Sequence, residues 1–347
     1  MCARFHVLAG AASARLLGGT VGLVCAAALS TSALAQSQPF SFGLWGDMPY
    51  AKAKDEPKIP ALIADMNASD IAFSLYDGDI KDGSSKCTDD VYEAAIRMFN
   101  QLRKPVLYIP GDNEWTDCHR LNNGGYDNLE RLAHIRKVMF AQAGTFGLET
   151  MPVERQGKPD EKFVENVRFL HNGVMFVGLN VPGSNNNKIL DEKDCSKKSA
   201  RTAAQCEASN AEYLERDAAN VAWMQQAFQA AKDQKARGLV LVIQADPGFD
   251  LPETEDIDES QAPGVSGYRN FIEKLVAETE QFKGQVLLVH GDTHFFKVDK
   301  PLYSPTRLLA NLTRLQTFGS PLIHWVRVTV DPKNANVFTV QPVIVQQ

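Results

Sequence analysis

The sequence lacks the motifs that mark several large classes of enzyme. No GxGxxG follows its first apolar run and no GK[ST] loop is present, which excludes the common dinucleotide-binding and P-loop enzymes. It also lacks a basic cluster or a basic stripe interleaved with aromatic residues, so we expect no sequence-specific nucleic-acid partner. No segment beyond the first 35 residues is apolar enough to predict a membrane span.

The N-terminus has the pattern of a bacterial-type export signal. Arg4 and Arg15 precede an apolar run from Leu16 to Leu29, and the small residues of Ala33-Leu34-Ala35 offer a cleavage site. A membrane anchor is the alternative, but glycines interrupt the run, and it is shorter than the roughly 20 residues that a span needs. We therefore expect residues 1–35 to be cleaved and the protein to be periplasmic or secreted, with no membrane span after cleavage.

Cleavage would leave residues 36–347 as a single domain. Removing 35 of the 347 residues leaves 312, which is ample for a buried core. The removed segment holds two of the 36 basic residues and none of the 42 acidic ones. The mature chain therefore has 34 basic and 42 acidic residues, a net charge of −8 with histidine neutral.

Four cysteines remain after cleavage: Cys87, Cys118, Cys195 and Cys206. An even number in an exported chain favours two disulfides, and no CxxC pair supports the alternative of a metal site. Four cysteines allow three pairings. We favour Cys195 with Cys206, because both lie in one short polar segment, which leaves Cys87 with Cys118.

From Phe40 onward, short apolar runs alternate with amphipathic stretches, as expected for an α/β protein. The predicted strands are Phe40–Trp45, Ile71–Tyr76, Pro105–Ile109, Val174–Leu179, Leu239–Ile243 and Gln285–Val289. The predicted helices are Pro57–Asn67, Asp89–Leu102, Asn128–Ala143, Glu212–Lys232 and Tyr268–Phe282. In the tail, three further strands would finish a second sheet: Arg307–Leu315, Trp325–Val330 and Val337–Val345. The polar segment 183–210 predicts an excursion stapled by a disulfide, either a lid or a surface insertion without a role.

Five short motifs follow predicted strands. They are Gly46-Asp47-Met48-Pro49-Tyr50, Gly78-Asp79-Ile80-Lys81-Asp82, Gly111-Asp112-Asn113-Glu114, Gln244-Ala245-Asp246-Pro247 and Gly291-Asp292-Thr293-His294. A single Gly-Asp pair is a common turn, because glycine adopts unusual dihedral angles and aspartate caps backbone amides. Strand ends in an α/β sheet converge at one edge, so five such motifs predict side chains that meet in the folded protein.

In order and approximate spacing, these motifs resemble those of the calcineurin-like metallophosphoesterases: DxH, GDxxD, GNH with an acid, a histidine after an apolar strand, and GHxH. The resemblance covers roughly Phe40 to Val330. It implies that family's α/β fold, a four-layer sandwich of two mixed β-sheets flanked by helices. Only GDxxD is matched in full, by Gly78, Asp79 and Asp82.

The other motifs depart from the family pattern, mostly by replacing histidine. Pro49, Gln244 and Asp292 each stand in the place of a histidine ligand. Asp112 stands for the metal-binding asparagine. By resemblance, the first metal would bind Asp47, Asp79 and His294, and the second would bind Asp79, Asp112, Gln244 and Asp292.

The resemblance implies two divalent metal ions. Because oxygen replaces imidazole nitrogen at several positions, hard ions such as Mn, Mg or Ca are favoured, with Fe or Zn as alternatives. Four carboxylates would need such cations, or protons, or nearby bases such as Lys81, Arg120 and Arg314, to offset their charge. The alternative is a degenerate site whose acids only cap loops.

The resemblance also implies hydrolysis of a phosphomonoester or phosphodiester, by in-line attack of a metal-activated hydroxide on phosphorus. Asn113 stands where the family has a histidine that donates a proton or contacts phosphate; its amide donates hydrogen bonds but transfers no proton near neutral pH. We therefore predict His119 as the proton donor and Arg120 as a phosphate clamp, the alternative being a loop histidine and a surface arginine. Tyr50 either points its hydroxyl at the site or packs against the first sheet.

Two classes of protein are consistent with these motifs. A metal-dependent hydrolase would turn over a phosphorylated small-molecule or polymer substrate, and a chelator would stop it. A catalytically degenerate protein of the same fold would bind a ligand or partner without turnover.

Overall fold

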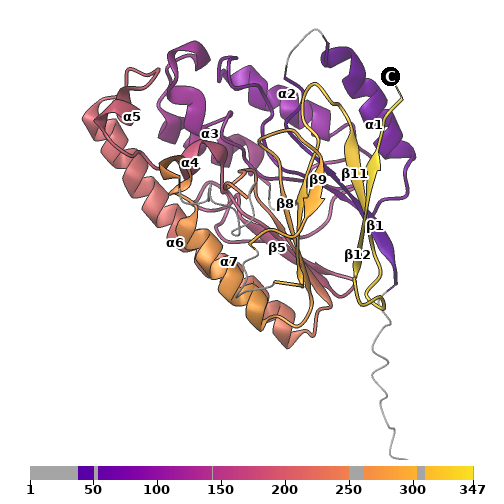
Figure 1. Ribbon diagram of the computed structural model, residues 1–347. Coiled ribbons are helices and arrows are strands. Elements are labelled where there is room, and N and C mark those ends of the chain that lie inside the picture. Colours follow the sequence, from indigo (N-terminus) through magenta and orange to yellow (C-terminus); the bar gives the residue numbers. More distant parts are fainter. Residues whose placement is uncertain (1–37, 51–53, 143, 250–261, 303–308, 347) are drawn as a thin grey trace, which may run out of the picture. The chain divides into compact units, whose positions relative to one another are not determined.

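The computed structural model describes residues 38–50, 54–142, 144–249, 262–302 and 309–346. Within these residues, two β-sheets stack face to face and helices cover their outer faces (Figure 1). This is the predicted four-layer α/β sandwich of two mixed sheets. The predicted export signal lies outside the described residues.

The first sheet combines strands from both ends of the chain. Its members are β1 (Phe40–Trp45), β2 (Ser74–Tyr76), β3 (Val106–Tyr108), β11 (Trp325–Val330) and β12 (Phe338–Val343), in the order β12-β11-β1-β2-β3. β1, β2 and β3 run parallel, while β11 lies antiparallel between β1 and β12. The carboxyl ends of β1, β2 and β3 therefore meet at one edge.

The second sheet has the order β4-β5-β6-β7-β8-β10-β9. Its members are β4 (Glu154–Arg155), β5 (Val167–His171), β6 (Val174–Gly178), β7 (Gly238–Val242), β8 (Gln285–His290), β9 (Lys297–Asp299) and β10 (Leu312–Gln316). The four strands β6, β7, β8 and β10 are parallel, so their carboxyl ends also share an edge. β5 and β6 form a hairpin whose turn, Asn172-Gly173, has positive φ at both residues, as a tight type I′ turn requires.

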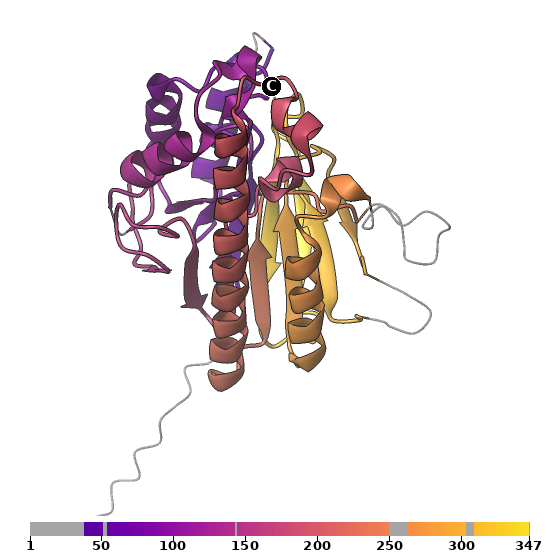
Figure 2. The same ribbon diagram turned by 90° about the vertical axis from the view of Figure 1, so that its left-hand side faces the viewer.

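Helices cover the outer face of each sheet. α1 (Ile59–Ala68), α2 (Asp89–Phe99) and α3 (Asn128–Met139) pack on the first sheet. α6 (Ala203–Asp233) and α7 (Arg269–Gln281) lie side by side on the second, as Figure 2 shows. The short helices are α4 (Gly183–Asn186), α5 (Glu192–Ser196), η1 (Glu56–Lys58), η2 (Thr116–His119), η3 (Leu121–Asn123) and η5 (Pro263–Val265).

Apolar side chains fill the space between the two sheets. Phe42 and Leu44 of β1 meet Val240 and Val242 of β7 there, all fully buried. Alternate residues of the same strands face the outer helices: Trp45 packs under α1 and α2. Burial on both faces explains why these strands read as continuous apolar runs, and it fixes the strand ends that carry the motifs.

The tail differs from the expectation that it would finish a second sheet. β10 pairs with β8 in the seven-stranded sheet, whereas β11 and β12 extend the five-stranded sheet beyond β1. The tail strands thus divide between the sheets, because β11 pairs with the side of β1 away from β2 and β10 pairs with the side of β8 away from β7. The first residues of the predicted strand Arg307–Leu315 lie outside the described residues.

The predicted excursion at 183–210 is more ordered than its composition indicates. α6 begins at Ala203 rather than at Glu212, because Thr202 and Gln205 form a capping box. Gln205 N donates to Thr202 Oγ1 (3.3 Å) and Thr202 N donates to Gln205 Oε1 (2.9 Å). The segment therefore contains α4, α5 and the first turns of α6.

Both predicted disulfides are confirmed. Cys87 pairs with Cys118 and Cys195 pairs with Cys206, each with a Cα–Cα distance of 5.8 Å. Such bonds are typical of oxidising compartments outside the cytoplasm. In the described part of the chain, no helix combines the length and hydrophobicity that a membrane crossing requires.

Candidate metal centre

Three aspartates from three of the predicted motifs meet at the carboxyl edge of the sheets. Asp79 and Asp112 follow β2 and β3 of the first sheet, and Asp292 follows β8 of the second. Carboxylate oxygens of the three all lie within 4.8 Å of one another. A cation with metal–oxygen bonds of about 2.1–2.4 Å fits among oxygens at such separations. Asp79 and Asp112 are buried, and Asp292 is partly buried.

The electrostatics of the three acids call for a positive charge. Burial raises the pKa of Asp79 and Asp292 well above the usual range, and the charge of Asp112 raises both further. The buried ammonium of Lys81 donates to the carbonyl oxygens of Asp82 and Asn113, both at 2.8 Å. A cation bound among the three carboxylates would supply the missing charge, so this set fits one of the two predicted ions.

Asn113 and Glu114 hold Asp79 in place. The Asn113 amide donates to Asp79 Oδ2 (2.6 Å), and its backbone N–H donates to Oδ1 (3.1 Å). Glu114 is fully buried and accepts from the backbone N–H of Asp79 (3.2 Å) and of Gly111 (2.7 Å). The residue that replaces the family's histidine therefore contacts the central carboxylate directly. Asp82 caps the following turn, where its Oδ1 accepts from Ser84 N (2.7 Å).

Gln244 lies beside Asp292 but presents its amide NH₂ to it. Nε2 donates to Asp292 Oδ1 (3.3 Å), while Oε1 accepts from Gly183 N (2.5 Å). In this orientation Gln244 orients Asp292 and turns its amide oxygen to Gly183, so its role as a ligand of the second ion stays a prediction. Gly183 packs so closely that a Cβ there would lie 2.7 Å from Asp112 Oδ2 and 2.9 Å from Asp292 Oδ1. Only glycine fits against the two carboxylates.

The three residues predicted to bind the first ion surround the hydroxyl of Tyr50. Tyr50 Oη lies 2.9 Å from His294 Nε2, 3.3 Å from Asp47 Oδ1 and 3.2 Å from Asp79 Oδ2. His294 Nδ1 lies 2.8 Å from the Ser320 carbonyl, so the protonated Nδ1 leaves Nε2 to accept from the phenol. In this arrangement the phenol oxygen contacts all three predicted ligands of the first ion, so it would compete with that ion for them.

Removing the Tyr50 hydroxyl should therefore favour binding of the first predicted ion, at Asp47, Asp79 and His294. We expect wild type to bind one Mn²⁺ per chain and Tyr50→Phe to bind two, measured by elemental analysis after dialysis against Mn²⁺. Tyr126→Phe, the same change outside the centre, should still bind one. A single ion in Tyr50→Phe would show that the hydroxyl does not exclude the other.

His119 and Arg120 line a pocket with Asp117 and Ser184 and do not belong to the group of three aspartates. Arg120 forms a close ion pair with Asp117 and donates to Ser184 Oγ (3.2 Å). Burial, together with the charges of Arg201 and Arg120, lowers the pKa of His119 to about 3. The imidazole is therefore neutral at pH 7, which is not the protonated form that a general acid needs.

The turn that links these groups, at residues 184–187, lies in the predicted excursion at 183–210, and no motif in the sequence marks it. Ser184, Asn185, Asn186 and Asn187 all have positive φ, between 49° and 63°. The turn places Ser184 Oγ 2.7 Å from Asp112 Oδ2 and 2.7 Å from Asp117 Oδ1. Four consecutive left-handed residues are unfavourable for L-amino acids, although asparagine tolerates them best, and such strain clusters at functional sites.

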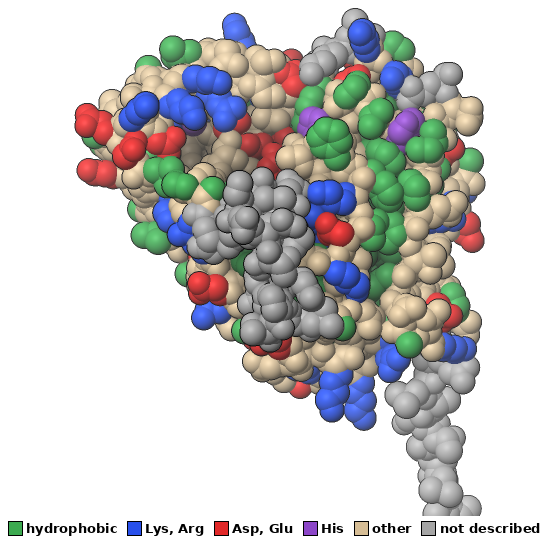
Figure 3. All heavy atoms as spheres, viewed as in Figure 1, with side chains coloured by type: hydrophobic (Ala, Val, Ile, Leu, Met, Phe, Trp, Pro, Cys, Tyr) green, Lys and Arg blue, Asp and Glu red, His purple; other side chains and the backbone are tan. Residues whose placement is uncertain are grey.

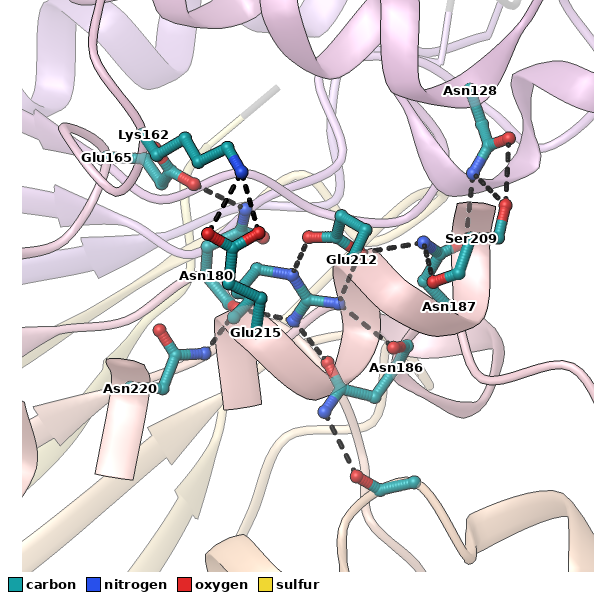
Figure 4. A network of polar contacts seen from close by, with 12 residues as sticks. Asn128, Lys162, Glu165, Asn180, Asn186, Asn187, Ser209, Glu212, Glu215 and Asn220 are labelled. Carbon is teal, nitrogen blue, oxygen red and sulfur yellow. Dashed lines mark hydrogen bonds and ion pairs between the residues drawn. The ribbon is translucent and has the colours of Figure 1, made fainter. Parts of the chain in front are cut away.

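A buried polar network holds this turn (Figure 4). Arg216 of α6 donates to Asn186 Oδ1 (2.5 Å), to the Asn186 carbonyl (3.0 Å) and to the Asn180 carbonyl (2.9 Å). Its guanidinium also pairs with Glu212. Asn187 donates to Glu212 Oε2 (2.8 Å) and accepts from Asn128 Nδ2 (2.9 Å). The asparagines thus tie the strained turn to α6 and α3.

No protein-family profile and no curated protein sequence matches the chain. The structure of PhoD matches with a TM-score of 0.54 and 11% identity, over 89% of this chain and 69% of that one. Purple acid phosphatase PPD1 from yellow lupin (Lupinus luteus) seeds has a TM-score of 0.47 and 13% identity, over 89% and 54% of the two chains. GAP50, the anchor in the inner membrane complex of Plasmodium, has a TM-score of 0.46 and 11% identity, over 89% and 90%.

The layered sheets and the PhoD match identify the fold. The chain has the calcineurin-like metallophosphoesterase fold, as the strand-end motifs indicated.

Proposed function

We propose that this protein is an exported, metal-dependent phosphoester hydrolase acting on a phosphorylated small molecule or polymer. The observation that carries the proposal is the meeting of Asp79, Asp112 and Asp292, with oxygens within 4.8 Å, at the carboxyl edge of this fold. A divalent cation bound there neutralises phosphate oxygens and activates water. Carboxylate ligands favour Mn, Mg or Ca over the softer ions.

The remaining roles belong to side chains around the three carboxylates. Asn113 fixes the orientation of Asp79 and offers an amide N–H toward a phosphate oxygen. Arg120 holds phosphate as a charged donor, retaining its contact with Ser184. His119 protonates the leaving group only where the substrate's charge outweighs burial and the charges of Arg201 and Arg120, and a good leaving group needs no donor.

The test is hydrolysis of activated aryl phosphate monoesters and diesters with Mn²⁺, Mg²⁺, Ca²⁺ or chelator. We expect turnover that requires a divalent cation and stops with chelator. Binding of metal without turnover of either ester class would favour the second candidate, a degenerate protein of this fold that holds a ligand. The replacement of several histidine ligands and the Tyr50 hydroxyl among Asp47, Asp79 and His294 are the observations that favour it.

A further inference from the structure

A basic pocket opens next to the three aspartates. It has a volume of about 310 Å³, the lower end of the range for small-molecule sites. Its walls are η2 with Arg120 on one side and the segment from Ser184 to Arg201 on the other. Figure 3 shows Lys and Arg side chains gathered near α5, beside a hollow in which Asp and Glu side chains lie deeper.

The pocket is positively charged, whereas the protein as a whole is negatively charged. Five cationic side chains line it: Arg120, Lys188, Lys197, Lys198 and Arg201. Two carboxylates, Asp117 and Asp194, accompany them. Asp117 forms a close ion pair with Arg120, and five cationic side chains against two carboxylates leave a net charge of +3 in the pocket. On a chain with a formal charge of −6, such a concentration of positive charge is a local attraction for anions.

The pocket and the aspartates share a wall. Ser184 lines the pocket, and its hydroxyl lies 2.7 Å from Asp112 Oδ2. Thr116 and Asp117 line it too, and both bond the Asp112 carbonyl: Thr116 Oγ1 donates at 3.0 Å and Asp117 N at 3.0 Å. None of the three aspartates lines the pocket itself, so a ligand that extends past Ser184 would contact both a cation held by Asp112 and the basic side chains.

Both walls of the pocket are covalently braced and joined to each other. The Cys87–Cys118 disulfide ends beside His119, and the Cys195–Cys206 disulfide ties α5 to α6. Across the pocket, Leu121 N donates to the Lys198 carbonyl (2.8 Å) and Ser199 Oγ donates to the His119 carbonyl (3.1 Å). A braced cluster of cations needs little ordering when it binds an anion, which favours affinity.

We propose that this pocket binds a second anionic group of the substrate, so that the preferred substrates are small phosphoesters whose alcohol carries another phosphate or a carboxylate. The inference rests on the proposed function, because the first phosphate is taken to lie at the three aspartates. The ammonium groups of Lys197 and Lys198 and the guanidinium of Arg201 meet the second anion, and Arg120 lies between the two positions.

Binding of matched ligands tests the pocket without requiring turnover. The mature protein with Mn²⁺ is titrated calorimetrically with the bisphosphates of ethanediol, propanediol and butanediol, and with the corresponding alkyl monophosphates. We expect at least one bisphosphate to bind about tenfold more tightly than its monophosphate or better, since a charge-assisted contact is worth that factor. Lys198→Gln and Arg201→Gln should each reduce this ratio severalfold.

Lys193→Gln is the matched control, because Lys193 is an exposed lysine of α5 that does not line the pocket. It should leave the ratio unchanged. Lys198→Gln keeps the test decisive if Arg201→Gln unfolds, since Arg201 also donates to the Cys195 carbonyl (3.2 Å). Equal affinity for all mono- and bisphosphates, or a preference that survives Lys198→Gln, would overturn the proposal.

The two proposals fail in different ways. Cation-dependent aryl phosphate hydrolysis without bisphosphate preference would retain the hydrolase and remove the second anion site. Bisphosphate preference that depends on Lys198, in a protein that hydrolyses no ester, would retain the anion site and remove the hydrolase.

Discussion

Asp79→Asn is expected to abolish cation-dependent hydrolysis and to weaken cation binding. Asp79 is buried, and its carboxylate is the one that Asn113 and the Glu114 loop hold against Asp112 and Asp292. Changing residues that merely orient ligands costs about 10- to 100-fold in affinity or activity, so a change to a central ligand should cost more than about 100-fold. The measurements are kcat/KM with an activated aryl phosphate and Mn²⁺ affinity by calorimetry.

The control is the same substitution at an exposed position. Asp70→Asn lies outside the site and should retain wild-type rates and metal affinity. Circular dichroism should show that Asp79→Asn is folded, because removing one charge from a group of buried carboxylates that repel one another does not destabilise the fold. Wild-type activity in folded Asp79→Asn would remove the hydrolase assignment.

Arg216→Met is expected to lower the free energy of unfolding by about 3–5 kcal/mol, the usual effect of removing one partner of a buried ion pair. Arg216 is fully buried, and its loss would take its charged donor from Glu212 and a hydrogen bond from the carbonyls of Asn180 and Asn186. Glu212 would keep Asn187 (2.8 Å), and the Asn180 carbonyl would keep Asn220 Nδ2 (2.8 Å). The left-handed turn at 184–187 would also lose its main anchor. Urea unfolding followed by tryptophan fluorescence measures the change.

The chain contains a matched pair for comparison. Glu93 and Arg97 on α2 have the same four-residue spacing as Glu212 and Arg216, but both of their side chains are largely exposed. Arg97→Met should therefore cost about 0.5 kcal/mol or less. Equal losses in the two variants would mean that burial of the Arg216 network contributes nothing to stability.

Much of the site could be predicted because its positions are set by backbone topology. A Gly-Asp pair after a buried parallel strand is carried to the sheet edge wherever the strand lies in the sequence. Asp79, Asp112 and Asp292 are of this kind, and the structure brings them together. The disulfides could also be predicted, because Cys195 and Cys206 lie close in sequence and their pairing leaves Cys87 with Cys118.

Other parts depend on contacts that no local pattern encodes. The position of the Tyr50 hydroxyl follows from packing against Asp79 and His294, which lie far from it in sequence. The conformation of the 184–187 turn depends on Arg216, a residue of α6. Two local signals were present but not used: Asn172-Gly173 for the β5–β6 hairpin, and Thr202 with Gln205 for the start of α6.

Crystals of residues 36–347 grown with Mn²⁺ give the most direct measurement, an anomalous difference map at the manganese edge. The account predicts one peak within bonding distance of the carboxylates of Asp79, Asp112 and Asp292, with the Tyr50 hydroxyl still in contact with His294. A map with no peak among those three carboxylates at saturating Mn²⁺ would contradict it.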